Sequence, residues 1–153
     1  AVRGIEDHGG GHMVHLGELG IDPFAVHVGE GTDLIVIGHA LGQTHFELVA
    51  GCCEQGETPE QSARRELLEE TGYGGGEWQQ FMVTSANPTN HNNLTYTFLA
   101  TGVERITEQN TEAGEDIELH LMNRDQVLEL LREDEILQCL HAAPLWKYFA
   151  SQR

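Results

Sequence analysis

The sequence predicts a mixed α/β sandwich, because short alternating strand patterns are interleaved with two or three helical segments and no long polar linker or internal repeat divides them. A chain of 153 residues suits one domain. It is long enough to bury roughly two-thirds of its unfolded surface without a disulfide or metal. We expect one domain over residues 23–153, preceded by a flexible N-terminal segment, residues 1–22, that is rich in glycine and histidine.

The first part of the domain is predicted to be made of strands. Phe24–Val28 has the pattern of a strand, residues 29–32 form a turn, and Leu34–Ile37 is the returning strand. A further short strand over Phe46–Val49 leads into Gly51.

A helix is predicted from Pro59 to Thr71. Thr58 is its N-cap, Pro59 occupies the first helical position, and Gln61 completes a capping box. Gly72 is the expected C-terminal stop, and the glycines at 74–76 are expected to prevent continuation.

The second half alternates in the same way. Trp78–Thr84 and Leu94–Thr101 are predicted strands that flank a loop, and Asp116–Met122 is a half-buried strand. Asn123 caps a second helix, with Gln126 in its capping box. A final helical segment over residues 134–149 is expected to be interrupted at Pro144.

The charge of the chain excludes some classes of partner. Eight Lys and Arg against 25 Asp and Glu give a net charge of −17, which disfavours binding to nucleic acid or to an anionic membrane. Cys52, Cys53 and Cys139 form no C-x-x-C pair, and an odd count argues against a disulfide framework. No apolar run reaches the ~18 residues of a membrane span. We therefore expect a cytoplasmic protein.

Three glutamates of the first predicted helix stand out. At 100° per residue, Glu66, Glu69 and Glu70 fall within roughly a 100° arc, where their charges repel one another. A divalent cation turns that repulsion into binding, and Mg²⁺ favours oxygen ligands that bridge it to phosphates. A solvated acidic face is the alternative. Arg65 lies on a different side of the helix and can hold Glu57, which would pin the preceding loop.

The spacing over Gly51–Tyr73 is G-x₅-E-x₇-R-E-L-x-E-E-x-G followed by Tyr. It resembles the signature of the Nudix hydrolases. The resemblance implies a Nudix-type α/β/α sandwich with a mixed sheet, and Mg²⁺-dependent hydrolysis of diphosphate linkages, with Mn²⁺ able to substitute. Tyr73 departs from the aliphatic residue of that pattern, and we expect it to fill the same core position.

The resemblance also assigns roles to residues. Glu66, Glu70 and Glu69 would bind metal, with the carbonyl of Ala50 as a further ligand. Glu57 and Arg65 would be structural partners. A general base outside the helix is expected, and Glu115 is preferred over Glu112, although an acidic turn explains either residue equally well. Glu69 is a further catalytic candidate.

The substrate is indicated by weaker features. Glu47–Gly51 reads E-L-V-A-G and resembles the E-L-P-A-G of the ADP-ribose pyrophosphatase branch, and Pro88 lies close to that branch's marker proline. Asn90 and Trp78 are further candidates for substrate contact. Each of the three also suits a structural role, in a turn or in the core. Against this branch, Gly38–Leu41 lacks its usual Gln and Arg.

Several functions stay open at this point. The first is hydrolysis of ADP-ribose or a related nucleotide sugar to AMP and a sugar phosphate. The alternatives are a nucleoside triphosphate pyrophosphatase that removes oxidised nucleotides, a nucleotide-sensing Nudix domain without catalysis, and an acidic interaction protein. The family resemblance also suggests a homodimer. A small nucleotide is the expected partner, rather than nucleic acid or membrane.

Overall fold

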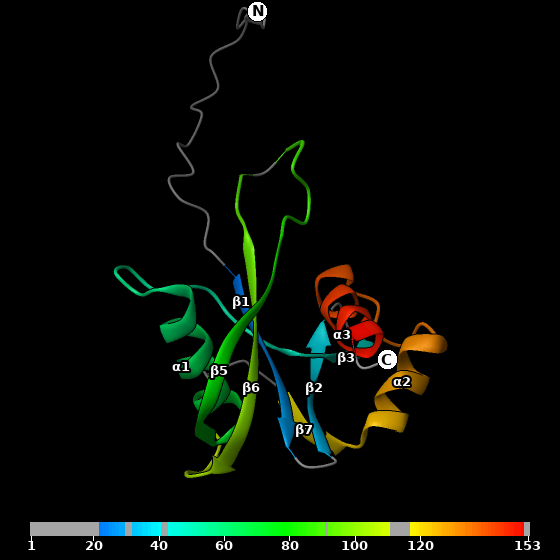
Figure 1. Cartoon of the computed structure of the whole chain (residues 1–153), viewed down its shortest axis with the longest axis horizontal. Coiled ribbons are helices and arrows are strands. Elements are labelled where there is room, and N and C mark those ends of the chain that lie inside the picture. Colours follow the sequence, from blue (N-terminus) through cyan, green and yellow to red (C-terminus); the bar gives the residue numbers. More distant parts are fainter. Residues whose placement is uncertain (1–21, 30–31, 41–42, 91, 111–116, 152–153) are drawn as a thin grey trace, which may run out of the picture.

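The computed structural model describes residues 22–29, 32–40, 43–90, 92–110 and 117–151. In these residues a mixed sheet lies between helix α1 on one side and helices α2 and α3 on the other (Figure 1). The predicted α/β/α sandwich is confirmed. The elements are β1 (Asp22–Gly29), β2 (Thr32–Ala40), β3 (Gln43–Glu47), β4 (Val49–Ala50), α1 (Pro59–Thr71), β5 (Tyr73–Thr84), β6 (Thr95–Arg105), β7 (Ile117–Met122), α2 (Arg124–Arg132) and α3 (Cys139–Ser151).

The sheet is mixed because one of its central pairings is parallel. Its main strand order is β3-β2-β1-β6-β5, while β4 pairs with β1 and β7 pairs with β2. Strands β1 and β6 run parallel, from Asp22 opposite Thr95 to Val28 opposite Thr101. The other pairings are antiparallel. Because β4 lies beside β1, its end at Ala50 delivers the following loop to the N-terminal end of α1.

Two hydrophobic cores lie on opposite faces of the sheet. Leu48 belongs to the core under α2 and α3, whereas its neighbour Val49 belongs to the core under α1. In β6, Leu99 packs against the core under α2 and α3, and Ala100 belongs to the core under α1. This is expected, because side chains alternate between the two faces along a strand. Tyr73 packs partly buried against the α1 core, the position expected for it.

Helix α1 has the predicted bounds because its capping signals are local. The Thr58 side chain accepts from the backbone N–H of Gln61, and the Gln61 side chain accepts from the N–H of Thr58. Gly72 ends the helix with a left-handed φ of 76°. A Cβ there would lie 2.2 Å from the carbonyl oxygen of Thr107, so both the backbone conformation and the close approach require glycine.

Several predicted strand boundaries are wrong. Strand β5 starts at Tyr73 instead of Trp78, because Gly74 and Gly75 pair with Glu104 and Val103 of a β6 that continues to Arg105. The predicted strand 46–49 is two strands on different partners, β3 on β2 and β4 on β1. The break falls at Leu48, whose N–H donates to the Nδ1 atom of His141 instead.

The last helix also differs from its prediction. It begins at Cys139 instead of residue 134, and it continues through Pro144 without interruption. Proline removes one helical hydrogen bond. Burial of Leu145, Tyr148 and Phe149 on the same helix offsets that loss. None of the helices in the described ranges is both long enough and apolar enough to cross a membrane.

Candidate active site

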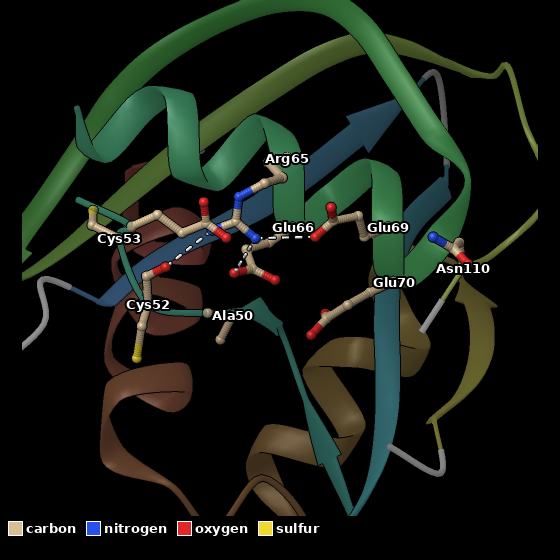
Figure 2. Close-up of a pocket in the computed structure, with 10 residues that line it drawn as sticks. Ala50, Cys52, Cys53, Arg65, Glu66, Glu69, Glu70 and Asn110 are labelled. Carbon is tan, nitrogen blue, oxygen red and sulfur yellow. Dashed lines mark hydrogen bonds and ion pairs between the residues drawn. The ribbon is translucent and has the colours of Figure 1, made fainter. Parts of the chain in front are cut away.

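A pocket of about 420 Å³ opens where the loop after β4 meets α1. Figure 2 shows it extending along the helix from Cys52 and Cys53 at one end to Asn110 at the other. Its lining residues are Ala50, Gly51, Cys52, Cys53, Glu54, Arg65, Glu66, Glu69, Glu70 and Asn110. Nine of these ten come from residues 50–70, so one loop and one helix make almost the whole site.

The three glutamates predicted to act together do line one pocket. Glu66, Glu69 and Glu70 project from positions about one turn apart on α1, as their helical spacing requires. Glu70 is the most buried of them, with 8% of its surface exposed. Grouping carboxylates in a partly buried site is costly unless positive charge offsets it. Arg65 supplies one positive charge against the three carboxylates, so the group stays net negative and favours a bound cation.

The backbone before the helix passes very close to Glu66. A Cβ on Gly51 would lie 2.0 Å from both the carboxyl carbon and one oxygen of Glu66. Only glycine allows the chain to pass at this point with Glu66 in its observed position. The same approach brings Ala50, at the end of β4, to the pocket wall beside the carboxylates.

Arg65 holds the loop and the helix together. Its guanidinium donates to both carboxylate oxygens of Glu57, at 3.0 and 3.1 Å, and to the carbonyl oxygen of Cys52 at 3.0 Å. These bonds, led by the one to Glu57, raise the pKa of Arg65 above its ordinary value. The bond from Arg65 likewise lowers the pKa of Glu57. Both groups stay charged at neutral pH.

Arg65 also contacts two of the pocket glutamates. This contact was not predicted, because Arg65 was expected to lie on a different side of the helix. It donates to Glu66 at 2.8 Å and to Glu69 at 3.0 Å. The long side chain can bend along the helix surface, so a difference in angular position does not separate it from them. Arg65 thus orients two carboxylates as well as the loop.

The donor chemistry of the site fits a hard divalent cation. Carboxylates and a backbone carbonyl are the oxygen ligands that Mg²⁺ and Mn²⁺ prefer. Within the described residues no three acidic, His or Cys side chains converge closely enough to hold an ion by themselves. Water and substrate phosphates, which commonly complete a Mg²⁺ shell, would have to supply further ligands. The metal roles of Glu66, Glu69, Glu70 and Ala50 stay predictions.

Comparison with known proteins decides the family. A model of the NUDIX domain matches residues 24–141, which is most of the chain and includes most of β1, the pocket loop and α1. The chain belongs to the NUDIX family.

An ADP-ribose pyrophosphatase from Bacillus subtilis (strain 168) is 32% identical to this Nudix chain over 98 residues. The match covers 63% of the chain and 52% of the relative, so the chain spans about half the length of that protein. Two solved structures are similar. One, described as an ADP compounds hydrolase, matches with a TM-score of 0.75 and 16% identity. The match covers 86% of this chain and 73% of the hydrolase chain. The other, a NUDIX hydrolase from Nitrosomonas europaea, has a TM-score of 0.65 and 20% identity, covering 88% and 90%. At such identities the structures show a shared fold.

Other predicted site residues of the Nudix domain lie away from the pocket. Pro88 and Asn90 are exposed on the connection between β5 and β6, where the N–H of Asn90 donates to Asn87 in a turn. Trp78 packs against the α1 core, and its ring lies under the guanidinium of Arg64. None of the three lines the pocket. Their proposed substrate contacts stay untested, and the described contacts are structural.

The predicted general bases, Glu112 and Glu115, lie outside the described residues, and the pocket contains residues that were not predicted as site residues. Asn110 lines the pocket but was missed, because nothing in the sequence near it marks a site. Its position depends on a contact between β6 and α1 that only the fold creates. Cys52, for which the sequence predicted no role in the site, is exposed and lines the pocket.

Proposed function

We propose that the protein is a Mg²⁺-dependent hydrolase of a nucleoside diphosphate derivative, with ADP-ribose or a related nucleotide sugar as substrate and AMP and a sugar phosphate as products. The observation that carries the proposal is the row of three glutamates from one helix in one pocket. Membership of the NUDIX family, whose enzymes generally use divalent metal ions, supports the reaction class. The ADP-ribose pyrophosphatase among its relatives supports the substrate.

In this proposal Glu66, Glu69, Glu70 and the Ala50 carbonyl hold the cation, and Mn²⁺ can replace Mg²⁺. When bound, the cation neutralises the diphosphate and lowers the pKa of the attacking water. Arg65 and Glu57 hold the loop against α1, which keeps Ala50 facing the carboxylates. Such pre-arranged ligands reduce the reorganisation needed when substrate binds.

A general base completes the proposed mechanism. Glu115 is the first candidate, with Glu112 and Glu69 as alternatives. The base would accept the proton of the attacking water. The test is turnover by Glu115→Gln. A fall of about 100-fold or more agrees with the role. Turnover within a few-fold of the wild type would remove Glu115 as the base.

Product analysis tests the substrate. The protein is incubated with ADP-ribose, other nucleoside diphosphate derivatives and nucleoside triphosphates, each with Mg²⁺ and with chelator. Glu70→Gln is run beside Glu60→Gln, a matched control on the same helix whose side chain bonds Arg64 outside the pocket. We expect metal-dependent AMP and ribose 5-phosphate from ADP-ribose. Glu70→Gln should lose more than about 100-fold, since even outer-shell changes at metal sites cost 10- to 100-fold.

Other outcomes would contradict parts of the proposal. Pyrophosphate release from a triphosphate would replace the substrate and keep the family chemistry. Tight nucleotide binding without metal-dependent turnover would favour a sensing domain. Calorimetry without saturable Mg²⁺ or Mn²⁺ binding would favour an acidic interaction protein.

We further propose that the active form is a homodimer, on the family resemblance. Light scattering at twice the chain mass is the expected result, and scattering at the monomer mass would end the idea.

A further inference from the structure

Asn110 is the pocket residue that comes from outside the loop and α1. It follows the end of β6 and lies beside the C-terminal end of α1, near Glu69 and Glu70 and at the opposite end of the pocket from Cys52 (Figure 2). Its amide group carries two N–H donors and one acceptor without charge. It is the one side-chain amide among the described lining residues.

The position of Asn110 is set by the end of α1. Its backbone N–H donates to the carbonyl oxygen of Glu69 at 2.8 Å. Ile106 and Thr107 donate in the same way to the carbonyl oxygen of Gly72, at 2.9 and 3.1 Å. The side chain of Gln109 bonds the carbonyl oxygen of Ile117 in β7. These bonds use backbone groups or a neighbouring side chain, so they leave the Asn110 amide for another partner.

The hydrogen-bond donors of Arg65 are already used within the protein. Four carboxylates line the pocket, from Glu54, Glu66, Glu69 and Glu70. All three guanidinium nitrogens of Arg65 already donate within the protein, to Glu57, Glu66, Glu69, Ser62 and the Cys52 carbonyl. The thiols of the pocket are weak donors. Among the described lining residues, Asn110 is therefore the strong side-chain donor that the bonds of Arg65 leave for an entering diphosphate.

We propose that Asn110 is a substrate-positioning residue, whose amide donates a hydrogen bond to a phosphoryl oxygen of the diphosphate at the C-terminal end of α1. The inference rests on the proposed function. A neutral donor suits this place, because it can bind a phosphoryl oxygen and, unlike a cationic side chain, forms no ion pair with the carboxylates that would hold the cation. An aspartate there would repel the same oxygen.

The test compares Asn110→Ala and Asn110→Asp with the wild type. Both keep the backbone N–H that bonds Glu69. Gln138→Glu is the matched control, since it turns an exposed amide outside the pocket into a carboxylate. Calorimetry measures binding of the non-hydrolysable α,β-methylene analogue of ADP-ribose in Mg²⁺, and of Mg²⁺ alone. Kinetics on the hydrolysed substrate separates KM from kcat, and thermal unfolding checks the fold.

We expect Asn110→Ala to weaken analogue binding and raise KM about tenfold, the effect of one hydrogen bond to a charged group. Asn110→Asp should weaken analogue binding and raise KM at least as much. Affinity for Mg²⁺ alone and the unfolding temperature of Asn110→Ala should match the wild type, and Gln138→Glu should bind the analogue normally.

Analogue binding by Asn110→Ala within twofold of a wild type that binds would overturn the role of Asn110 alone. An equal loss of Mg²⁺ binding, or a large fall in unfolding temperature, would make the residue structural and also overturn it. A wild type that neither binds the analogue nor hydrolyses any substrate overturns this proposal together with the proposed function.

Discussion

Protonation of His141 is predicted to destabilise the protein in weak acid. The side chain lies in α3 with 1% of its surface exposed, and its Nδ1 accepts the N–H of Leu48 at 2.8 Å. Burial lowers its pKa from 6.5 to about 4. An acceptor at Nδ1 requires neutral imidazole, so protonation would both bury a charge and leave the Leu48 N–H without its acceptor.

The sign and size of the effect follow from the two pKa values. Between pH 6.5 and 4 the unfolded chain binds the proton more readily than the folded one, so the free energy of unfolding falls as the pH falls. The stability is fully present above pH 6.5 and is lost as the pH approaches 4. From pH 7.5 to pH 5 the loss from this one group is about 2 kcal/mol. For a domain of this size it corresponds to roughly 4–8 °C in unfolding temperature.

Urea unfolding between pH 7.5 and 5 measures the effect, with His141→Asn as the test variant. Asparagine can offer an amide oxygen to Leu48 and does not titrate. We expect the stability difference between wild type and His141→Asn to shrink by about 2 kcal/mol over this range. Leu145→Ala, a core change in the same helix, is the control, and its difference from the wild type should stay constant with pH. Parallel pH curves for wild type and His141→Asn would refute the reasoning.

Two further predictions concern the pocket. Gly51→Ala should lower turnover more than tenfold by displacing Glu66, with little change in stability because a flexible side chain can move. Gly74→Ala is its control, because the added Cβ would come close only to side-chain atoms of Ile106 and Leu68, outside the pocket. Normal turnover by Gly51→Ala would contradict the idea. Arg65→Lys should lower the free energy of unfolding by about 2 kcal/mol in urea, because an ammonium cannot replace the fork that holds Glu57. Unchanged stability would mean that this fork contributes little.

The sequence alone determined the features that depend on neighbouring residues. Thr58, Gln61 and Gly72 set the bounds of α1, because capping bonds join residues within one turn. The helical repeat then placed Glu66, Glu69 and Glu70 toward one pocket. The family signature follows from the same local spacing.

Only the tertiary structure decided which distant segments meet. β5 begins at Tyr73 because β6 pairs with its glycines, although glycine is unfavourable in an isolated strand. The buried His141 accepts a hydrogen bond from the N–H of Leu48, 93 positions away, at the break between β3 and β4. Asn110 is held at the pocket by the hydrogen bond from its backbone N–H to the carbonyl oxygen of Glu69. These contacts join residues far apart in the chain, and their energies depend on the packing of the whole sheet, which no local pattern records.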